Sequence, residues 1–173
     1  MPGDKLRYAL VGEGDEASFF LEAAEASGNC VVTALVSDDQ RRSDQLARRF
    51  GIHLTKTVGE FARVLQLEAV DAVCLVSPDH ARDVLSRGLP LVYVAATASG
   101  QAAGASVRAM AGEAPLLVLG ADRMSVRLLQ EYSARMLAIR AGASAAGSDR
   151  VSPDLKTAAA GADRPLFQEG RDG

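Results

Sequence analysis

Residues 12 to 17, Gly-Glu-Gly-Asp-Glu-Ala, form a G-x-G-x-x-A pattern directly after an apolar run, Leu6–Val11. Between a strand and a helix, this pattern is typical of a loop that holds the pyrophosphate of a dinucleotide. Gly12 would permit a tight turn, Gly14 would let the main chain approach a phosphate, and Ala17 would let the helix pack closely on the strand. The free N–H groups at the start of the helix would then face the phosphates.

Three carboxylates, Glu13, Asp15 and Glu16, lie in or beside this turn. Acidic residues in a first helical turn stabilise the helix through its dipole, so the turn has a purely structural interpretation as well. Next to a pyrophosphate the same charges would repel the ligand unless they point to solvent. Both interpretations stay open, and Glu13 is counted with the glycines among the candidate cofactor contacts.

The second apolar run, Cys30–Val36, is followed by polar residues that could bind the ribose of a dinucleotide. An acid about 20 residues beyond the glycine pattern accepts from the ribose of NAD, whereas a nearby Arg accommodates the 2′-phosphate of NADP. The corresponding position is Ser37, and Arg41 and Arg42 follow it, so these residues favour NADP slightly. Asp38 would serve NAD if the register shifts by one. Alternatively, Ser37 or Asp38 caps the next helix and both arginines are solvated.

Short apolar runs alternate along the chain with segments of helical spacing. The runs are nearly continuous, which is typical of strands covered on both faces. Repetition of the strand–helix unit predicts an α/β fold with a Rossmann-type, doubly wound, mostly parallel sheet and helices on both faces, in three layers. The expected strands are Leu6–Val11, Cys30–Val36, Val70–Val76, Leu89–Ala95 and Pro115–Leu119, with a weaker run at His53–Thr55.

Two helix starts can be read from local chemistry. Thr57 and Glu60 form a capping box before an apolar helical segment. Asp122 is expected to cap one long helix over residues 123–140 that packs on the sheet. Beyond it, residues 141–173 are rich in Ala, Gly, Ser and charge, which predicts a disordered tail after a nucleotide-binding domain at 1–140.

Composition excludes several classes of protein. The chain has 173 residues, a net charge of −3 and 5% aromatic residues without Trp, so it lacks the basic and aromatic surface of a nucleic-acid binder. The N-terminal apolar run, Leu6–Val11, is too short for a signal-peptide core or a membrane span, which makes the cytoplasm the expected location. Cys30 and Cys74 lie in apolar runs and are expected to be reduced core residues, and neither has the spacing of a metal ligand.

Four segments together resemble the nucleotide-binding domain of the glucose–fructose oxidoreductase / inositol dehydrogenase / MocA (Gfo/Idh/MocA) family. They are "KLRYALVGEGDEAS", "VVTALVSDDQRRSDQLARRFGI", "TVGEFARVLQLEAVDAVCLVSPDH" and "PLLVLGADR". The most specific pieces are Ala47 to Ile52 and the run that ends in Ser77-Pro78-Asp79-His80. The resemblance implies an NAD(P)-dependent oxidoreductase acting on a sugar- or polyol-like CH–OH group, with Ser77 and Pro78 lining the nicotinamide side of the cofactor cleft.

The chain departs from that family's pattern where catalysis would occur. The family carries Glu-Lys-Pro at the end of its fifth strand, with a lysine that acts at the substrate, whereas this chain has Val94-Ala95-Ala96. The family's second domain, which binds substrate, is also not recognisable in residues 141–173. These departures predict a degenerate active site. His80 is a weak catalytic candidate, because it follows the fourth main strand at its carboxyl end, although a cap or surface role is the more common one.

Three functions therefore stay open. The chain is an NAD(P)-binding oxidoreductase domain, a non-catalytic Rossmann-type nucleotide-binding or protein-interaction module, or a decayed relative that keeps only the fold. A homo-oligomer or a protein partner is possible at the face where a second domain would pack.

Overall fold

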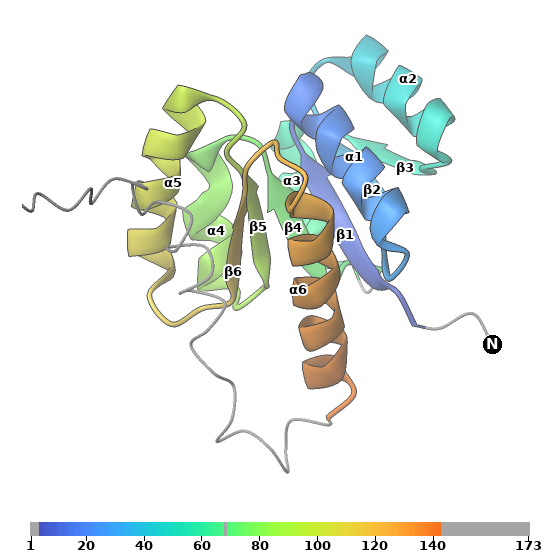
Figure 1. Cartoon of the computed structure of the whole chain (residues 1–173). Coiled ribbons are helices and arrows are strands. Elements are labelled where there is room, and N and C mark those ends of the chain that lie inside the picture. The colour runs from blue at the N-terminus through green and yellow to red at the C-terminus, as the bar shows by residue number, and fades with distance from the viewer. Residues whose placement is uncertain (1–3, 68, 143–173) are drawn as a thin grey trace, which may run out of the picture.

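A computed structural model describes residues 4–67 and 69–142 of the chain and shows a six-stranded parallel sheet with helices on both faces (Figure 1). The strands run in the order β3-β2-β1-β4-β5-β6, and every pair is parallel. The strands are β1 (Leu6–Val11), β2 (Cys30–Val36), β3 (Leu54–Lys56), β4 (Ala72–Leu75), β5 (Leu91–Val94) and β6 (Leu116–Leu119). The helices are α1 (Asp15–Ser27), α2 (Gln40–Phe50), α3 (Phe61–Val64), α4 (Ala81–Ser86), α5 (Ala98–Ala111) and α6 (Ser125–Arg140).

This strand order confirms the predicted doubly wound fold. The chain builds β1, β2 and β3 outward in one direction and then returns to the other side of β1 to add β4, β5 and β6. Val11, the last residue of β1, pairs with Val36 on one side and with Leu75 on the other. The carboxyl ends of β1, β2 and β4 therefore meet at the point where the strand order reverses, which is where open α/β sheets bind their ligands.

The strands are apolar throughout because helices cover both of their faces. In β1, Tyr8 and Leu10 are buried beneath α1 and α6, and Ala9 and Val11 join the core on the opposite face. The Tyr8 ring meets the Phe20 ring edge to face at 5.3 Å.

The predicted capping box is confirmed, and the predicted start of the last helix is wrong by two residues. The Glu60 carboxylate accepts hydrogen bonds from the Thr57 N–H at 3.2 Å and the Thr57 hydroxyl at 3.3 Å. The last helix, α6, begins at Ser125 rather than residue 123. The reason is that Asp122 accepts from the Met124 N–H at 2.8 Å and so stabilises a turn before the helix.

An ion cluster lies at the amino ends of the central strands β1 and β4, at the opposite end of the sheet from the glycine turn. The Asp71 carboxylate accepts from the Arg7 side chain at two distances of 2.9 Å, from the Arg7 N–H at 3.0 Å and from Arg140 at 2.7 Å. Burial alone would raise the pKa of the Asp71 carboxyl, but the hydrogen bonds and charge of Arg7, with the charge of Arg140, bring that pKa below its usual value. The cluster joins β1, the approach to β4 and the end of α6.

The expected disordered tail lies outside the described residues, except for its first two positions, so it and the domain boundary near residue 140 stay predictions. In the described ranges, no helix is both long and apolar enough to cross a membrane. Cys30 and Cys74 are buried free thiols, as expected.

Candidate functional site

Gly12 follows directly after β1 and has a φ of 131°, a conformation that favours glycine. A β-carbon built on Gly12 would lie 2.0 Å from Cγ2 of Val76, the residue that follows β4. Real β-carbons do not approach other atoms so closely. Gly12 is thus required by the packing of β1 against the end of β4, whether or not a ligand is present.

Gly14 caps α1 and leaves the start of that helix open to a ligand. Its φ of 87° and ψ of −160° lie in a region that only glycine adopts readily, and no side chain caps the helix. The Ser18 N–H bonds to the Gly14 carbonyl at 3.2 Å, so the N–H groups ahead of Ser18 point out of the first turn. Ala17 is fully buried where α1 packs on the sheet.

Two charged side chains lie beside Gly14. A β-carbon built there would lie 3.6 Å from Oε2 of Glu16 and 3.9 Å from Nη1 of Arg42. The Arg42 guanidinium, which comes from α2, can therefore supply positive charge beside the helix start, and the residues present fit a diphosphate. Glu16 opposes that charge and lowers the attraction for an anion.

Glu13 reaches across the turn to the end of β2. Its Oε2 accepts hydrogen bonds from the buried Ser37 hydroxyl and from the Asp39 N–H, the latter at 3.2 Å. The Ser37 hydroxyl oxygen also accepts from the Asp39 N–H at 3.1 Å. The Glu13 carboxylate thus links the glycine turn to the end of β2. The sequence alone shows only that Glu13 belongs to the turn.

The remaining polar residues after β2 do not take the places that were expected. Asp38 accepts from the Val58 N–H at 3.0 Å. Asp39, rather than Ser37 or Asp38, is the cap of α2, because its side chain accepts from the Arg42 N–H at 3.0 Å. Arg41 is exposed, in agreement with its solvated interpretation.

The expected nicotinamide-side residues form a capped turn. Ser77 donates its hydroxyl proton to Oδ2 of Asp79 at 2.8 Å and caps a short 3-10 helix whose first residue is Pro78. The His80 ring packs against the Phe61 ring at 5.1 Å, and its Nδ1 lies 3.8 Å from Oδ2 of Asp83. His80 is therefore placed as a packed residue at the start of α4.

The carboxyl end of β5 has no ionisable group at the place where the family carries lysine. Val94 and Ala95 are buried and Ala96 is half-buried. The preceding residue, Tyr93, is buried, and its ring lies beside Gly104 of α5. Burial raises the pKa of the Tyr93 hydroxyl, and the Asp79 and Glu16 carboxylates raise it further, so this hydroxyl stays protonated near neutral pH.

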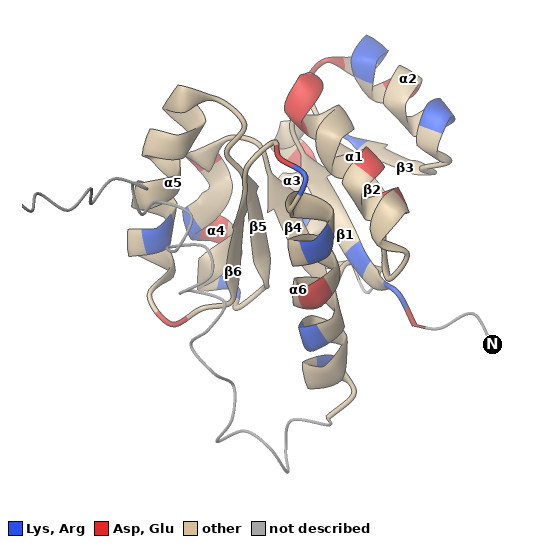
Figure 2. Ribbon diagram, viewed as in Figure 1, with Lys and Arg blue, Asp and Glu red and all other residues tan. Residues whose placement is uncertain are grey.

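Charge around the site is mostly negative. The segments 12–17 and 37–42 carry five carboxylates and two guanidinium groups. Figure 2 shows the acidic first turn of α1 near the basic first turn of α2. In the described part of the chain, no three His, Cys, Asp or Glu side chains are grouped as a metal site would require.

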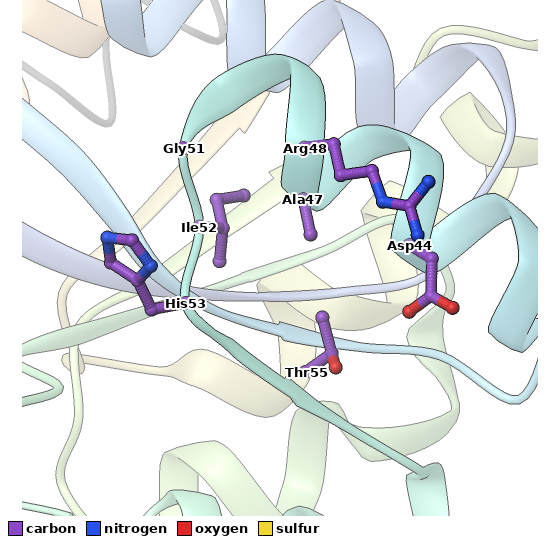
Figure 3. A pocket seen from close by; sticks show the side chains of 7 residues that line it. All are labelled: Asp44, Ala47, Arg48, Gly51, Ile52, His53 and Thr55. Carbon is purple, nitrogen blue, oxygen red and sulfur yellow. The ribbon is translucent and has the colours of Figure 1, made fainter.

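A separate hollow lies between α2 and the edge strand β3, with a volume of about 430 Å³ (Figure 3). Asp44 and Arg48 of α2 line it, together with Ile52, His53 and Thr55. The His53 ring and the Asp44 carboxylate lie at opposite ends of the hollow, so they form no catalytic pair. None of its lining residues belongs to the glycine turn.

Comparison with known proteins places these features in a family. Residues 6–92 match the sequence model of the Gfo/Idh/MocA oxidoreductase family, NAD-binding Rossmann fold. No curated protein matches the chain significantly.

Several solved structures share the fold. An oxidoreductase from Agrobacterium radiobacter, in complex with NAD+, L-tartaric acid and magnesium, is 19% identical, with a TM-score of 0.55 over 66% of this chain and 35% of its own. A Gfo/Idh/MocA oxidoreductase from Vibrio cholerae is 24% identical, with a TM-score of 0.52 over 66% of this chain and 38% of its own. KijD10, a 3-ketoreductase from Actinomadura kijaniata in complex with TDP-benzene and NADP, is 23% identical, with a TM-score of 0.53 over 78% and 42%.

At these identities the likeness shows the fold, and the matched region covers less than half of each of these proteins. The sequence model, in contrast, matches half of the chain and includes β1, the glycine turn, β2 and the end of β4. The chain belongs to the Gfo/Idh/MocA oxidoreductase family, in the part that forms its NAD-binding Rossmann domain.

Proposed function

We propose that this chain binds a nicotinamide dinucleotide across the glycine turn and is the cofactor-binding part of an oxidoreductase. The observation that carries the proposal is the start of α1 at Gly14, which has no side-chain cap and has the Arg42 guanidinium beside it. Helix N–H groups and a cation together suit a diphosphate. Ser37 and Glu13 extend the same site toward the ribose, and Ser77 and Pro78 extend it toward the nicotinamide.

Hydride transfer itself is chemistry that the bound nicotinamide supplies, and the protein must hold it in place and provide an acid–base group. The described residues support the first task better than the second. The end of β5 presents Val94, Ala95 and Ala96, and His80 is packed on Phe61. We therefore propose that this chain alone lacks the proton-transfer group for oxidising a CH–OH group, and that further polypeptide, from the same protein or a partner, completes a substrate site.

A second candidate function is favoured by the same apolar end of β5: a non-catalytic module that binds the dinucleotide without turning it over. Self-association or a protein partner is part of this candidate. Both candidates include a cytoplasmic location, which the two buried free thiols, Cys30 and Cys74, support.

Calorimetric titration of the purified chain with NADH and with NADPH tests the shared claim. Micromolar binding of either dinucleotide is the expected result, and no heat at millimolar concentration would remove the proposal. Dehydrogenase assays with sugars and polyols then separate the two candidates. Turnover by this chain alone would show that an acid–base group is present after all.

A further inference from the structure

We propose that Glu13, from the glycine turn, recognises the adenosine ribose of the dinucleotide and selects NAD over NADP. The inference rests on the proposed function and names the ligand class of the same site. A preference for NAD is opposite to the slight preference for NADP that the positions of Ser37, Arg41 and Arg42 in the sequence indicate.

The position of the Glu13 carboxylate carries the argument. In dinucleotide-binding folds, the acid that accepts from the ribose hydroxyls stands at the end of β2. This chain has Ser37 there, and the Ser37 hydroxyl and the Asp39 N–H both donate to Oε2 of Glu13. The carboxylate from the turn thus stands at the place of the missing acid, and two donors at the end of β2 hold it there.

The other acids at the end of β2 are committed elsewhere. Asp38 accepts from the Val58 N–H, and Asp39 caps α2 through the Arg42 N–H. Glu13 is exposed, and both of its hydrogen bonds within the described part of the chain are accepted by Oε2, which leaves Oε1 open to a ligand. Glu13 is therefore the carboxylate best placed to accept from a ribose diol.

Charge then decides between the two dinucleotides. A ribose diol donates hydrogen bonds to a carboxylate, whereas a phosphate monoester brings a charge of about −1.5 to −2 at neutral pH. That charge would stand next to the Glu13 carboxylate. One of the two candidate cations, Arg42, is turned toward Gly14, with Nη1 3.9 Å from the β-carbon position there, and its Nε lies 3.9 Å from Oδ2 of Asp39. The other, Arg41, is exposed. The ribose end of the site therefore favours the uncharged 2′-hydroxyl.

The test compares dissociation constants for NADH and NADPH in the full chain, with ADP and 2′,5′-ADP as probes of the adenosine end alone. The wild-type chain is expected to bind NADH roughly tenfold or more tightly than NADPH, and ADP more tightly than 2′,5′-ADP. Glu13→Gln keeps the shape and an acceptor oxygen but removes the charge. This variant is expected to bring both ratios to within about threefold of unity, mainly through tighter binding of the 2′-phosphates.

Glu16→Gln is the matched control, because it removes one carboxylate from the same turn on the side of Gly14. It should change the affinities for NADH and NADPH by similar factors and leave their ratio as in the wild type. Circular dichroism spectra of both variants check that they fold.

The possible outcomes separate this inference from the proposed function. Binding of both dinucleotides with NADPH equal or preferred in the wild type overturns the role of Glu13 and leaves the proposed function standing. An unchanged ratio in Glu13→Gln, or an equal change of ratio in Glu16→Gln, also overturns it. Absence of binding by either dinucleotide removes the proposed function and this inference together.

Discussion

The Val76 side chain fills the space that a β-carbon on Gly12 would need, with Cγ2 of Val76 at 2.0 Å from that position. Gly12 follows β1, and Val76 follows β4 on the neighbouring strand, so the contact lies where the strand order reverses. The first glycine of the pattern is thereby explained by the fold, and Gly14 is the glycine whose role points to a ligand.

Gly12→Ala is expected to lower the free energy of unfolding by about 3 kcal/mol, because it adds a steric overlap and keeps a φ of 131° that alanine disfavours. Urea denaturation followed by circular dichroism measures this loss. Val76→Ala removes the overlap, so the double variant should lose less than the two single variants together. Additive losses would show that Val76 does not restrict position 12.

Asp71→Asn is expected to lower the free energy of unfolding by about 2 kcal/mol at pH 7, because it removes the charged acceptor shared by Arg7 and Arg140. Asp83, whose side chain is 68% exposed, offers the matched control. Asp83→Asn should change the free energy of unfolding by less than about 0.5 kcal/mol. Equal losses in the two variants would contradict the role given to the ion cluster.

The same carboxyl makes stability depend on pH. Since the pKa of Asp71 is lowered in the folded chain, its contribution is fully present above its unfolded pKa of about 3.9 and is lost as pH falls through the lower folded pKa. Denaturation curves of the wild type and Asp71→Asn should therefore converge as the pH is lowered below 4. A constant difference down to pH 2 would show that the charge of Asp71 is not involved.

Local sequence patterns are sufficient for most of the fold. The bounds of β1 and β2 follow directly from apolar runs, and the Thr57–Glu60 capping box is visible in four consecutive residues. The start of α6 was misplaced because Asp122 bonds to Met124 in a preceding turn, which an N-cap pattern does not distinguish from a true cap. Helix α5 has mostly small residues, so no apolar period marks its bounds.

Arg42→Ala is expected to weaken the binding of NADH and NADPH by a similar factor, about five- to tenfold, because the guanidinium stands beside Gly14 and would contact the diphosphate that both share. Calorimetric titration measures both constants. Arg48→Ala, which removes a cation from the last turn of the same helix, should leave both unchanged. A selective loss of NADPH binding in Arg42→Ala would place this side chain at the 2′-phosphate instead.

His80→Ala is expected to leave the affinity for dinucleotide within about twofold of the wild type, since its ring packs on Phe61 at the start of α4. Thermal unfolding should show a loss of about 1 kcal/mol from this ring contact. If the chain turns over a sugar or polyol and this variant abolishes turnover with its stability intact, His80 is the missing acid–base group.

The candidate site is harder to predict from the sequence than the fold, because its side-chain contacts join segments that are distant in the chain. The spacing of Ser37 and Asp38 from the glycine turn predicts that the segment after β2 lies near that turn, and the hydrogen bond between Ser37 and Glu13 agrees with this proximity. Nothing in that spacing shows that Glu13 crosses to Ser37 or that Asp38 turns to Val58, because side-chain directions depend on how β1, β2 and the following turns pack. The acidic character of the turn was the one available signal for Glu13.

The most direct test of dinucleotide binding at the glycine turn is a titration of the isotopically labelled chain with NADH, followed through its backbone amide resonances. The account predicts saturable shifts at Gly14, Asp15 and Glu16 and at the end of β2 near Ser37, with little change around the hollow at His53. Shifts confined to the α2–β3 hollow, or no shifts at millimolar NADH, would contradict it.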